Sequence, residues 1–328
     1  MSGKNAELLE IRGPVLDDLV EADAVIRREL ASDVVLVNQI SEYIIGAGGK
    51  RLRPLLVLLA ARAAGASAGS NHVLGSIVIE FIHTATLLHD DVVDGSGQRR
   101  GRDTANAVFG NAASVLVGDF LYSRAFQMMV RLGHSRIMSI MADATNVIAE
   151  GEVLQLMNAG DPDTTEARYL DVIYRKTARL FEAGAQVAAV LAGASSTVEN
   201  ALAAYGRHLG NAFQLVDDSL DYLGDPVTRG KNVGDDLAEG KPTLPVIYAL
   251  QHGTERQRTL LRKVILEGGL DDLQEVILAI ETSGGLEYTA RLAQREADQA
   301  LASLEPLPES VHKTALKNLA AFAVKRSF

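Results

Sequence analysis

Residues 137–151 read IMSIMADATNVIAEG, and their apolar positions recur with the period of an α-helix. These positions stand one or three residues apart, and they are Ile137, Ile140, Met141, Ala144, Val147, Ile148 and Gly151. This spacing places them on one stripe of a helix with 3.6 residues per turn, and Asp143, Asn146 and Glu150 lie off the stripe. The stretch therefore predicts an amphipathic helix that buries one face.

The same pattern extends over most of the chain. Similar stripes occupy residues 15–31, 51–65, 72–92, 114–131, 166–192, 199–222 and 284–303. Segments 72–90 and 183–193 are apolar on most sides, which is typical of helices inside a large bundle. The glycine- and serine-rich stretch 65–71 predicts a turn between two helices, and alternating strand patterns are missing. We therefore predict a single all-α domain over residues 1–328.

The composition limits the classes of function. The chain has 328 residues, 47% of them hydrophobic, so it can bury a large core. It has no cysteine, which excludes disulfides and thiolate chemistry and leads us to expect a cytoplasmic location. The net charge of −10 argues against nucleic acid as a partner. An apolar run of about 18 residues and a signal-peptide core are both missing, so we expect no stable membrane insertion.

One acidic pattern, Asp-Asp-x-x-Asp, occurs twice, each time after an apolar helical stretch. The two copies comprise Asp90, Asp91 and Asp94, and Asp217, Asp218 and Asp221. Residues four apart lie on one face of a helix, so the outer aspartates of each copy point the same way. Their charges repel unless a cation lies between them, and carboxylates suit Mg²⁺ that also binds substrate phosphates. A single copy could equally be a solvated helix end, but the occurrence of two copies predicts a metal site.

Several cations and one histidine accompany the acidic motifs. The cations are Lys50, Arg51, Arg53, Arg99, Arg100, Lys176, Lys231 and Lys241. Arginine recognises phosphate through paired N–H donors, although each of these residues alone is as readily a solvated surface cation. His83 lies seven residues before Asp90, on almost the same helix face; a core histidine with a hydrogen-bond partner is the equal alternative. We expect the neighbouring His89 to be solvated.

Carboxylates that need cations, beside cations that need anions, indicate a polyanionic substrate bound through Mg²⁺. Two acidic motifs and several basic groups predict two diphosphates brought together. Apolar helices lead into both acidic ends, so we expect a deep apolar cavity with a charged rim. The ligand should be amphipathic, with a diphosphate head on a hydrocarbon tail.

With these residues, the chain resembles the trans-isoprenyl diphosphate synthase family, and within it the long-chain, octaprenyl diphosphate synthase branch. The resemblance covers almost the whole length and rests on an ordered set of motifs. These are GGKRLRP (48–54), LLHDDVVD (87–94), RRG (99–101), GNAASVLVGD (110–119), GEVLQL (151–156), KTARLF (176–181), FQLVDDSLDY (213–222), GKNVGDDL (230–237) and GKPTLP (240–245). It implies a homodimer of large antiparallel helix bundles, each around a central cavity. It also implies Mg²⁺-dependent elongation of an allylic diphosphate, such as farnesyl diphosphate, with isopentenyl diphosphate, for quinone side chains.

The resemblance also implies a role for each group. Two Mg²⁺ would lie on Asp90 and Asp94, and a third on Asp217 and Asp221. Isopentenyl diphosphate would be held by Lys50, Arg53, His83 and Arg100. The allylic substrate would be contacted by Arg99, Lys176, Thr177, Gln214, Lys231 and Lys241. The expected catalytic set is Asp90, Asp94, Arg99, Lys176 and Asp217.

Product length depends on where the growing tail stops. In this family, bulky aromatics at the fourth and fifth positions before the first motif end growth early, and here these positions hold Thr86 and Ala85. The path is therefore open, and resemblance favours an octaprenyl (C40) product. Met129 lies ten residues past Asp119, about 15 Å along a helix. We expect Met129, together with Met128, to form the floor; ordinary core packing is the alternative.

Three rival functions remain open at this point. A class I terpene cyclase also uses an aspartate-rich motif, but it would normally carry a different second metal motif and would not need GGKRLRP. A catalytically silent partner subunit would tend to lose the aspartates, and all six are present. A purely structural helical scaffold would explain the apolar stripes but not the two acidic motifs.

Overall fold

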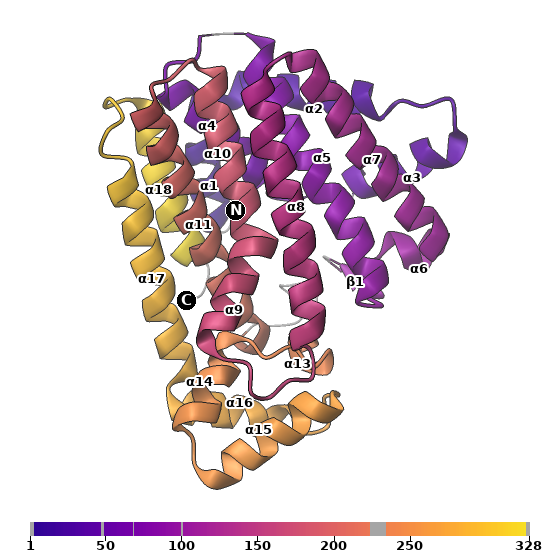
Figure 1. Cartoon of the computed structure of the whole chain (residues 1–328), viewed down its shortest axis with the longest axis vertical. Helices are drawn as coiled ribbons and strands as arrows, with labels where there is room; N and C mark the ends of the chain where they lie inside the picture. The colour runs from indigo at the N-terminus through magenta and orange to yellow at the C-terminus, as the bar shows by residue number, and fades with distance from the viewer. Residues whose placement is uncertain (1–2, 47–48, 68, 100, 224–233, 326–328) are drawn as a thin grey trace. The chain divides into compact units, whose positions relative to one another are not determined.

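The computed structural model describes residues 3–46, 49–67, 69–99, 101–223 and 234–325 (Figure 1). Helices make up most of this part of the chain, which confirms the predicted all-α class. Besides helices, turns and loops, the described residues form one small antiparallel hairpin of two-residue strands, β1 (Gln98–Arg99) and β2 (Arg102–Asp103). The sequence pattern did not indicate this hairpin, because two residues are too few to alternate.

The helices up to the first acidic motif are α1 (Gly3–Arg12), η1 (Gly13–Val15), α2 (Leu16–Leu30), α3 (Val35–Gly46), α4 (Leu52–Ala63) and α5 (Ser70–Val93). The next are α6 (Ala105–Phe109), α7 (Asn111–Leu132), α8 (Ser135–Asn158), α9 (Glu166–Ile173), the π-helical turn η2 (Tyr174–Ala178), α10 (Arg179–Leu191) and α11 (Ser196–Leu223). The last are α13 (Asp235–Ala238), α14 (Leu244–His252), α15 (Glu255–Glu267), α16 (Leu273–Ser283), α17 (Gly285–Ser303) and α18 (Val311–Lys325).

The stretch 137–151 lies inside α8, and its stripe is the buried face of that helix. Ile137, Met141 and Ala144 have no exposed surface, whereas Asp143 and Glu150 are exposed. The stretch 166–192, by contrast, is not one regular helix. It divides into α9, the π turn η2 and α10, because one wider turn interrupts the regular α-helix.

The chain forms two compact units, each assembled from separate stretches. Unit 1 comprises Met1–Thr145, Leu180–Gly206 and Ser303–Leu319, and unit 2 comprises Asn146–Arg179, Arg207–Ala302 and Ala320–Phe328. The first acidic motif belongs to unit 1 and the second to unit 2. A single domain over residues 1–328 stays a prediction.

The core of unit 1 is built around α4 and α5. Every side chain from Leu55 to Ala61 is fully buried, so α4 is apolar on all sides. Helix α10 approaches closely at Gly184, where a Cβ atom would lie 3.1 Å from Val57 and 3.5 Å from Ile79. The absence of a side chain at Gly184 therefore lets three helices pack together.

One helix in the described part of the chain is long and apolar enough to cross a membrane, by length and composition only. It is Asn71–Val93, with a mean hydropathy of 1.2, and 61% of the relevant window is buried. This burial is what a core helix of unit 1 requires.

The core of unit 2 lies among its C-terminal helices. Its largest cluster draws on α11, α13, α14, α15, α16 and α17, and includes Tyr222, Leu237, Val246, Leu261 and Ile280. A second cluster joins α9 to α11 and α14 through Tyr169, Leu215 and Leu244. These contacts hold α11, which carries the second acidic motif, against α9.

Candidate functional site

The first acidic motif ends α5. Asp90 and Asp91 belong to its last turn, and Asp94 is the C-cap, with its N–H donating to the Asp90 carbonyl at 2.8 Å. The side chains of Asp90 and Asp94 are half-buried, whereas Asp91 is only 4% exposed. As predicted, the two outer carboxylates lie on one face of the helix, and Asp91 lies off that face.

Asp91 holds Arg99, which the sequence assigned to the allylic substrate. Arg99 donates to one oxygen of Asp91 from Nε at 2.9 Å and from Nη2 at 2.7 Å. These bonds use two of the five N–H groups of the guanidinium. The pair brings the cation to the end of α5, beside the outer aspartates. Arg100 lies outside the described residues.

The predicted isopentenyl diphosphate residues are partly brought together. Arg53, at the start of α4, lies with Nη1 at 2.9 Å from Nε2 of His83 on α5, and its guanidinium stands over the ring of Phe181 at 4.5 Å. Lys50 is exposed, and its carbonyl accepts from Nη2 of Arg12 at 2.7 Å. Arg51 lies between Lys50 and Arg53 in the sequence, and it is the one described non-glycine residue with a positive φ, at 44°. This left-handed backbone conformation turns the chain into α4, which begins at the next residue.

The second motif lies in the last turns of α11. Asp217 is half-buried, and Asp221 is 3% exposed. A carboxylate oxygen of Asp221 accepts from the backbone N–H of Asp236 at 3.2 Å. The backbone carbonyl of Asp221 accepts from the N–H of Gly234 at 3.0 Å. The segment that begins α13 is thus tied to the last aspartate of the motif.

The middle aspartate of this motif, Asp218, is held from two sides. The hydroxyl of Tyr169 donates to one of its oxygens, and Nε2 of Gln214 donates to the other at 2.7 Å. Burial raises the pKa of Asp218 well above its usual range, the charge of Asp236 raises it further, and the two hydrogen bonds oppose the increase. Thr177 donates to Oε1 of Gln214 at 2.8 Å. Thr177 and Gln214, predicted as substrate contacts, therefore also bond to each other.

Lys176 lies within the π turn η2, a kind of helix irregularity that often marks functional sites. Its ammonium group pairs with Glu152 of α8 at 2.6 Å. The two helices approach closely because position 151 is glycine: a Cβ there would lie 2.8 Å from the backbone nitrogen of Lys176. Lys241 pairs with Glu239, and Lys231 lies outside the described residues.

The residues predicted to control product length are all inside the protein. Ala85, Met128 and Met129 have no exposed surface, and Thr86 is half-buried with its hydroxyl bonded to the His83 carbonyl at 2.8 Å. A cavity of about 60 Å³ lies between α2, α3, α5 and α7. Its lining includes His83, but none of the four length residues. Their placement is consistent with ordinary core packing as well as with a floor.

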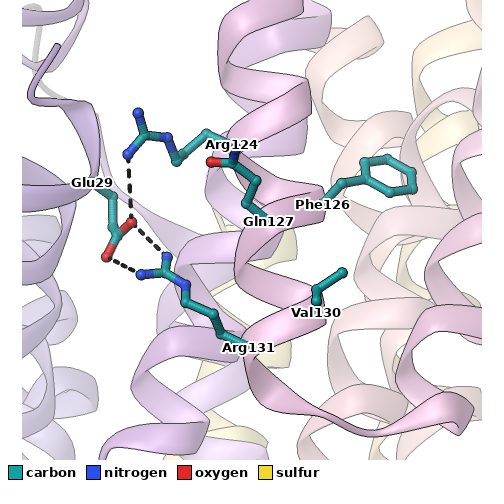
Figure 2. Close-up of a pocket in the computed structure, with 6 residues that line it drawn as sticks. All are labelled: Glu29, Arg124, Phe126, Gln127, Val130 and Arg131. Carbon is teal, nitrogen blue, oxygen red and sulfur yellow. Dashed lines mark hydrogen bonds and ion pairs between the residues drawn. The ribbon is translucent and has the colours of Figure 1, made fainter. Parts of the chain in front are cut away.

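A larger hollow of about 440 Å³ lies farther along α7 (Figure 2). Arg131 binds both oxygens of the buried Glu29, at 3.1 and 2.6 Å, and Arg124 approaches it at 4.0 Å. Phe126 and Val130 also line the hollow, and in Figure 2 they project from α7 away from Glu29. Phe126, three residues before Met129 on α7, therefore lines a surface hollow.

His89, predicted to be solvated, remains partly accessible, with 34% of its side chain exposed, but it also contacts α7. It is half-buried, with Nε2 at 3.2 Å from the carbonyl of Val115 and 3.4 Å from a carboxylate oxygen of Asp119. Neither contact is visible in the sequence, because α7 begins 22 residues after His89.

Within the described residues, no three histidine, aspartate or glutamate side chains form a group that could hold a metal alone. Each motif instead offers two carboxylates one helical turn apart. Mg²⁺ is usually bound by one or two carboxylates together with waters and substrate phosphates. The donors present therefore fit Mg²⁺ that is shared with a phosphorylated substrate.

Comparison with known proteins gives one consistent result. The sequence profile of the polyprenyl synthetase family matches residues 34–280. Octaprenyl diphosphate synthase of Escherichia coli (strain K12) is 56% identical over 310 residues, covering 94% of this chain and 96% of that protein. The enzyme of the same name from Haemophilus influenzae is 55% identical over 312 residues, covering 95% and 94%. A polyprenyl synthase from Caulobacter crescentus CB15, solved with calcium and isoprenyl diphosphate, aligns with a TM-score of 0.94 at 44% identity, over 98% of each chain.

Proposed function

This chain belongs to the polyprenyl synthetase family, and we propose that it is a prenyltransferase that makes a long all-trans polyprenyl diphosphate. It extends an allylic diphosphate, such as farnesyl diphosphate, by successive additions of isopentenyl diphosphate, to octaprenyl (C40) length. The observation that carries this proposal is the pair of Asp-Asp-x-x-Asp motifs, each with two outer carboxylates on one helix face, in a chain 56% identical to an octaprenyl diphosphate synthase.

The outer aspartates are the proposed metal ligands. Asp90 and Asp94 would hold two Mg²⁺, and Asp217 and Asp221 would hold a third. Bound Mg²⁺ would supply charge stabilisation for the pyrophosphate that leaves the allylic carbon. The calcium in the Caulobacter crescentus relative is consistent with a site for divalent ions in this family.

The basic side chains divide between the two substrates. We assign Lys50, Arg53, His83 and Arg100 to the diphosphate of isopentenyl diphosphate. We assign Arg99, Lys176, Thr177, Gln214, Lys231 and Lys241 to the allylic substrate. The contact of Arg53 with His83 supports the first assignment, because one imidazole and one guanidinium converge there.

The reaction follows from charge and position. The cationic side chains stabilise the departing pyrophosphate, so the allylic C–O bond breaks and leaves a carbocation. The double bond of isopentenyl diphosphate attacks this cation, and a proton passes to the released pyrophosphate. The protein orients both substrates, and its apolar interior keeps water away from the cation. Each cycle lengthens the product by five carbons.

We also propose that the protein is a cytoplasmic homodimer that supplies quinone side chains. Helix α7 exposes apolar side chains that a second copy would cover: Leu116 is 66% exposed, Val130 is 68% exposed and Val115 is 36% exposed.

A net charge of −10 disfavours binding to nucleic acid.

The first test is direct. The purified protein is incubated with farnesyl diphosphate, labelled isopentenyl diphosphate and Mg²⁺, and the dephosphorylated products are sized by mass. We expect a dominant C40 product that disappears with a chelator and in Asp90→Asn or Asp217→Asn variants. A series of shorter products would support the elongation reaction but contradict the proposed C40 length. No elongation with Mg²⁺ present would refute the proposal.

A further inference from the structure

The last turn of α5 rests on α7 through two consecutive residues. The hydroxyl of the fully buried Ser114 donates to the carbonyl of Leu88 at 3.0 Å. The next residue, His89, lies with Nε2 at 3.2 Å from the carbonyl of Val115. Leu88 and His89 immediately precede Asp90, so the backbone that leads into the first proposed metal ligand is held against α7.

The imidazole of His89 occupies a place that only glycine leaves open. A Cβ atom at position 118 would lie 2.3 Å from Nε2 and 2.6 Å from Cδ2 of His89. The ring therefore packs closely against α7 at Gly118, one residue before Asp119, whose carboxylate is 3.4 Å from Nε2. Asp119 is 63% exposed, so its ion pair with His89 contributes little. The other two contacts of the imidazole, with the Val115 carbonyl and with the backbone at Gly118, are called the seat below.

This seat matters because the C-terminal end of a helix disfavours carboxylates. The helix dipole places partial negative charge there, and Asp90, Asp91 and Asp94 add three more acidic groups. Without a second helix to hold it, such a turn would fray and its ligands would separate. Groups behind metal ligands commonly set their orientation, and their loss weakens metal affinity.

We propose that His89, seated on Gly118, is a positioning residue that holds Asp90 and Asp94 in the geometry that binds a metal–diphosphate complex. The inference rests on the proposed function, and it concerns the allylic half of the reaction alone. Lys50 and Arg53 lie at the start of α4, and His83 lies more than one helical turn before His89 on α5, so we expect binding of isopentenyl diphosphate to be unaffected.

The test is a double-mutant cycle on His89→Ala and Gly118→Ala, read by calorimetric titration with inorganic pyrophosphate in the presence of Mg²⁺. Either substitution removes the seat, so we expect each to weaken Mg²⁺-dependent pyrophosphate binding by about tenfold. The allylic KM should rise comparably, and the KM for isopentenyl diphosphate should stay unchanged. The double variant should be no worse than the worse single one, because both changes abolish one interaction.

Two controls keep the outcome decisive. His134→Ala, at an exposed histidine, should change nothing, and His89→Gln should restore binding through its side-chain donor. Gly118→Ala retains the imidazole, so it tests the seat even where His89→Ala fails to fold. Unchanged affinity in both single variants, or additive losses in the double variant, would overturn the inference. A wild-type protein that neither elongates nor binds Mg²⁺ pyrophosphate would instead refute the proposed function.

Discussion

The middle aspartate of each acidic motif has a different partner from its neighbours. Asp91 accepts two bonds from Arg99, and Asp218 accepts bonds from Tyr169 and Gln214. Both middle side chains are almost fully buried, at 4% and 5% exposure. Buried carboxylates require such partners, since an unpaired one is costly. In each motif the middle residue therefore anchors the end of the helix, and the two outer residues are the ones that we propose as metal ligands.

Met129 offers a test of product length. Met129→Ala removes a fully buried side chain, and the resulting cavity should cost about 2–5 kcal/mol in the free energy of unfolding. If Met129 is the floor, the cavity also lengthens the channel, and products should shift above C40. The measurement is the mass distribution of dephosphorylated products at saturating isopentenyl diphosphate.

The matched control is Phe126→Ala, on the same helix. Phe126 lines the surface hollow beside Glu29 (Figure 2), so its loss should leave product length unchanged. An unaltered product distribution in Met129→Ala, with the enzyme still active, would mean that Met129 is core packing and that the floor lies elsewhere.

At the scale of the element, α5 shows how a helix ends in three acidic residues. Its last carbonyls lack partners within the helix, and the residues that follow supply one of them: the Asp91 carbonyl accepts from the N–H of Ser96 at 3.0 Å and from Nδ2 of Asn106 at 3.1 Å. One turn earlier, Ser114 adds a bond to the carbonyl of Leu88. Thr104 and Asn106 also donate to the carbonyl of Ser96, just beyond the helix. The residues between the first motif and α7 therefore stabilise a helix end that its own charges destabilise.

The close approach of α8 to the π turn gives a prediction for Gly151→Ala. In an isolated helix this change would stabilise by about 1 kcal/mol. Here the new Cβ would lie 2.7 Å from Cβ of Arg175 and 2.8 Å from the nitrogen of Lys176. Overpacking costs about 1–3 kcal/mol, so we expect a net loss of stability. Displacement of Lys176 should also raise the allylic KM.

The readouts are urea unfolding and steady-state kinetics. Gly13→Ala is the control, because a Cβ at position 13 meets no atom within 4 Å. If Gly151→Ala proved as stable as the wild type with an unchanged allylic KM, the helices would have to separate easily, and the glycine would have no special role.

At the scale of the whole molecule, the exposed side of α7 predicts an interface between copies. Leu116→Glu places a charge where an isologous interface would bury it, so we expect dimers to dissociate. The measurement is sedimentation velocity at several protein concentrations.

Leu278→Glu, at a leucine of α16 that is 58% exposed, should leave the assembly unchanged. A wild-type protein that sediments as a monomer would contradict the homodimer. Equal behaviour of the Leu116 and Leu278 variants would show that the interface lies on another surface.

Much of this protein could be predicted from its sequence, because the signals are local and periodic. The stripe at 137–151 proved to be the buried face of α8, since helical periodicity reports directly on which face avoids water. The spacing of Asp90 and Asp94 likewise determined that they share a face of α5. The family resemblance then supplied roles that the periodicity could not.

Only the tertiary structure decided which partners the polar groups have. Arg99 is held by Asp91, Lys176 by Glu152, and His89 by the backbone of α7. The π turn at 174–178, which lies close to Gly151 of α8, was likewise not visible in the sequence pattern. These hydrogen bonds and ion pairs join elements that only the folded chain brings together, and the buried Asp91 in particular requires its partner. Sequence by itself determined the helices and the kind of chemistry, whereas packing decided which side chains remain available for it.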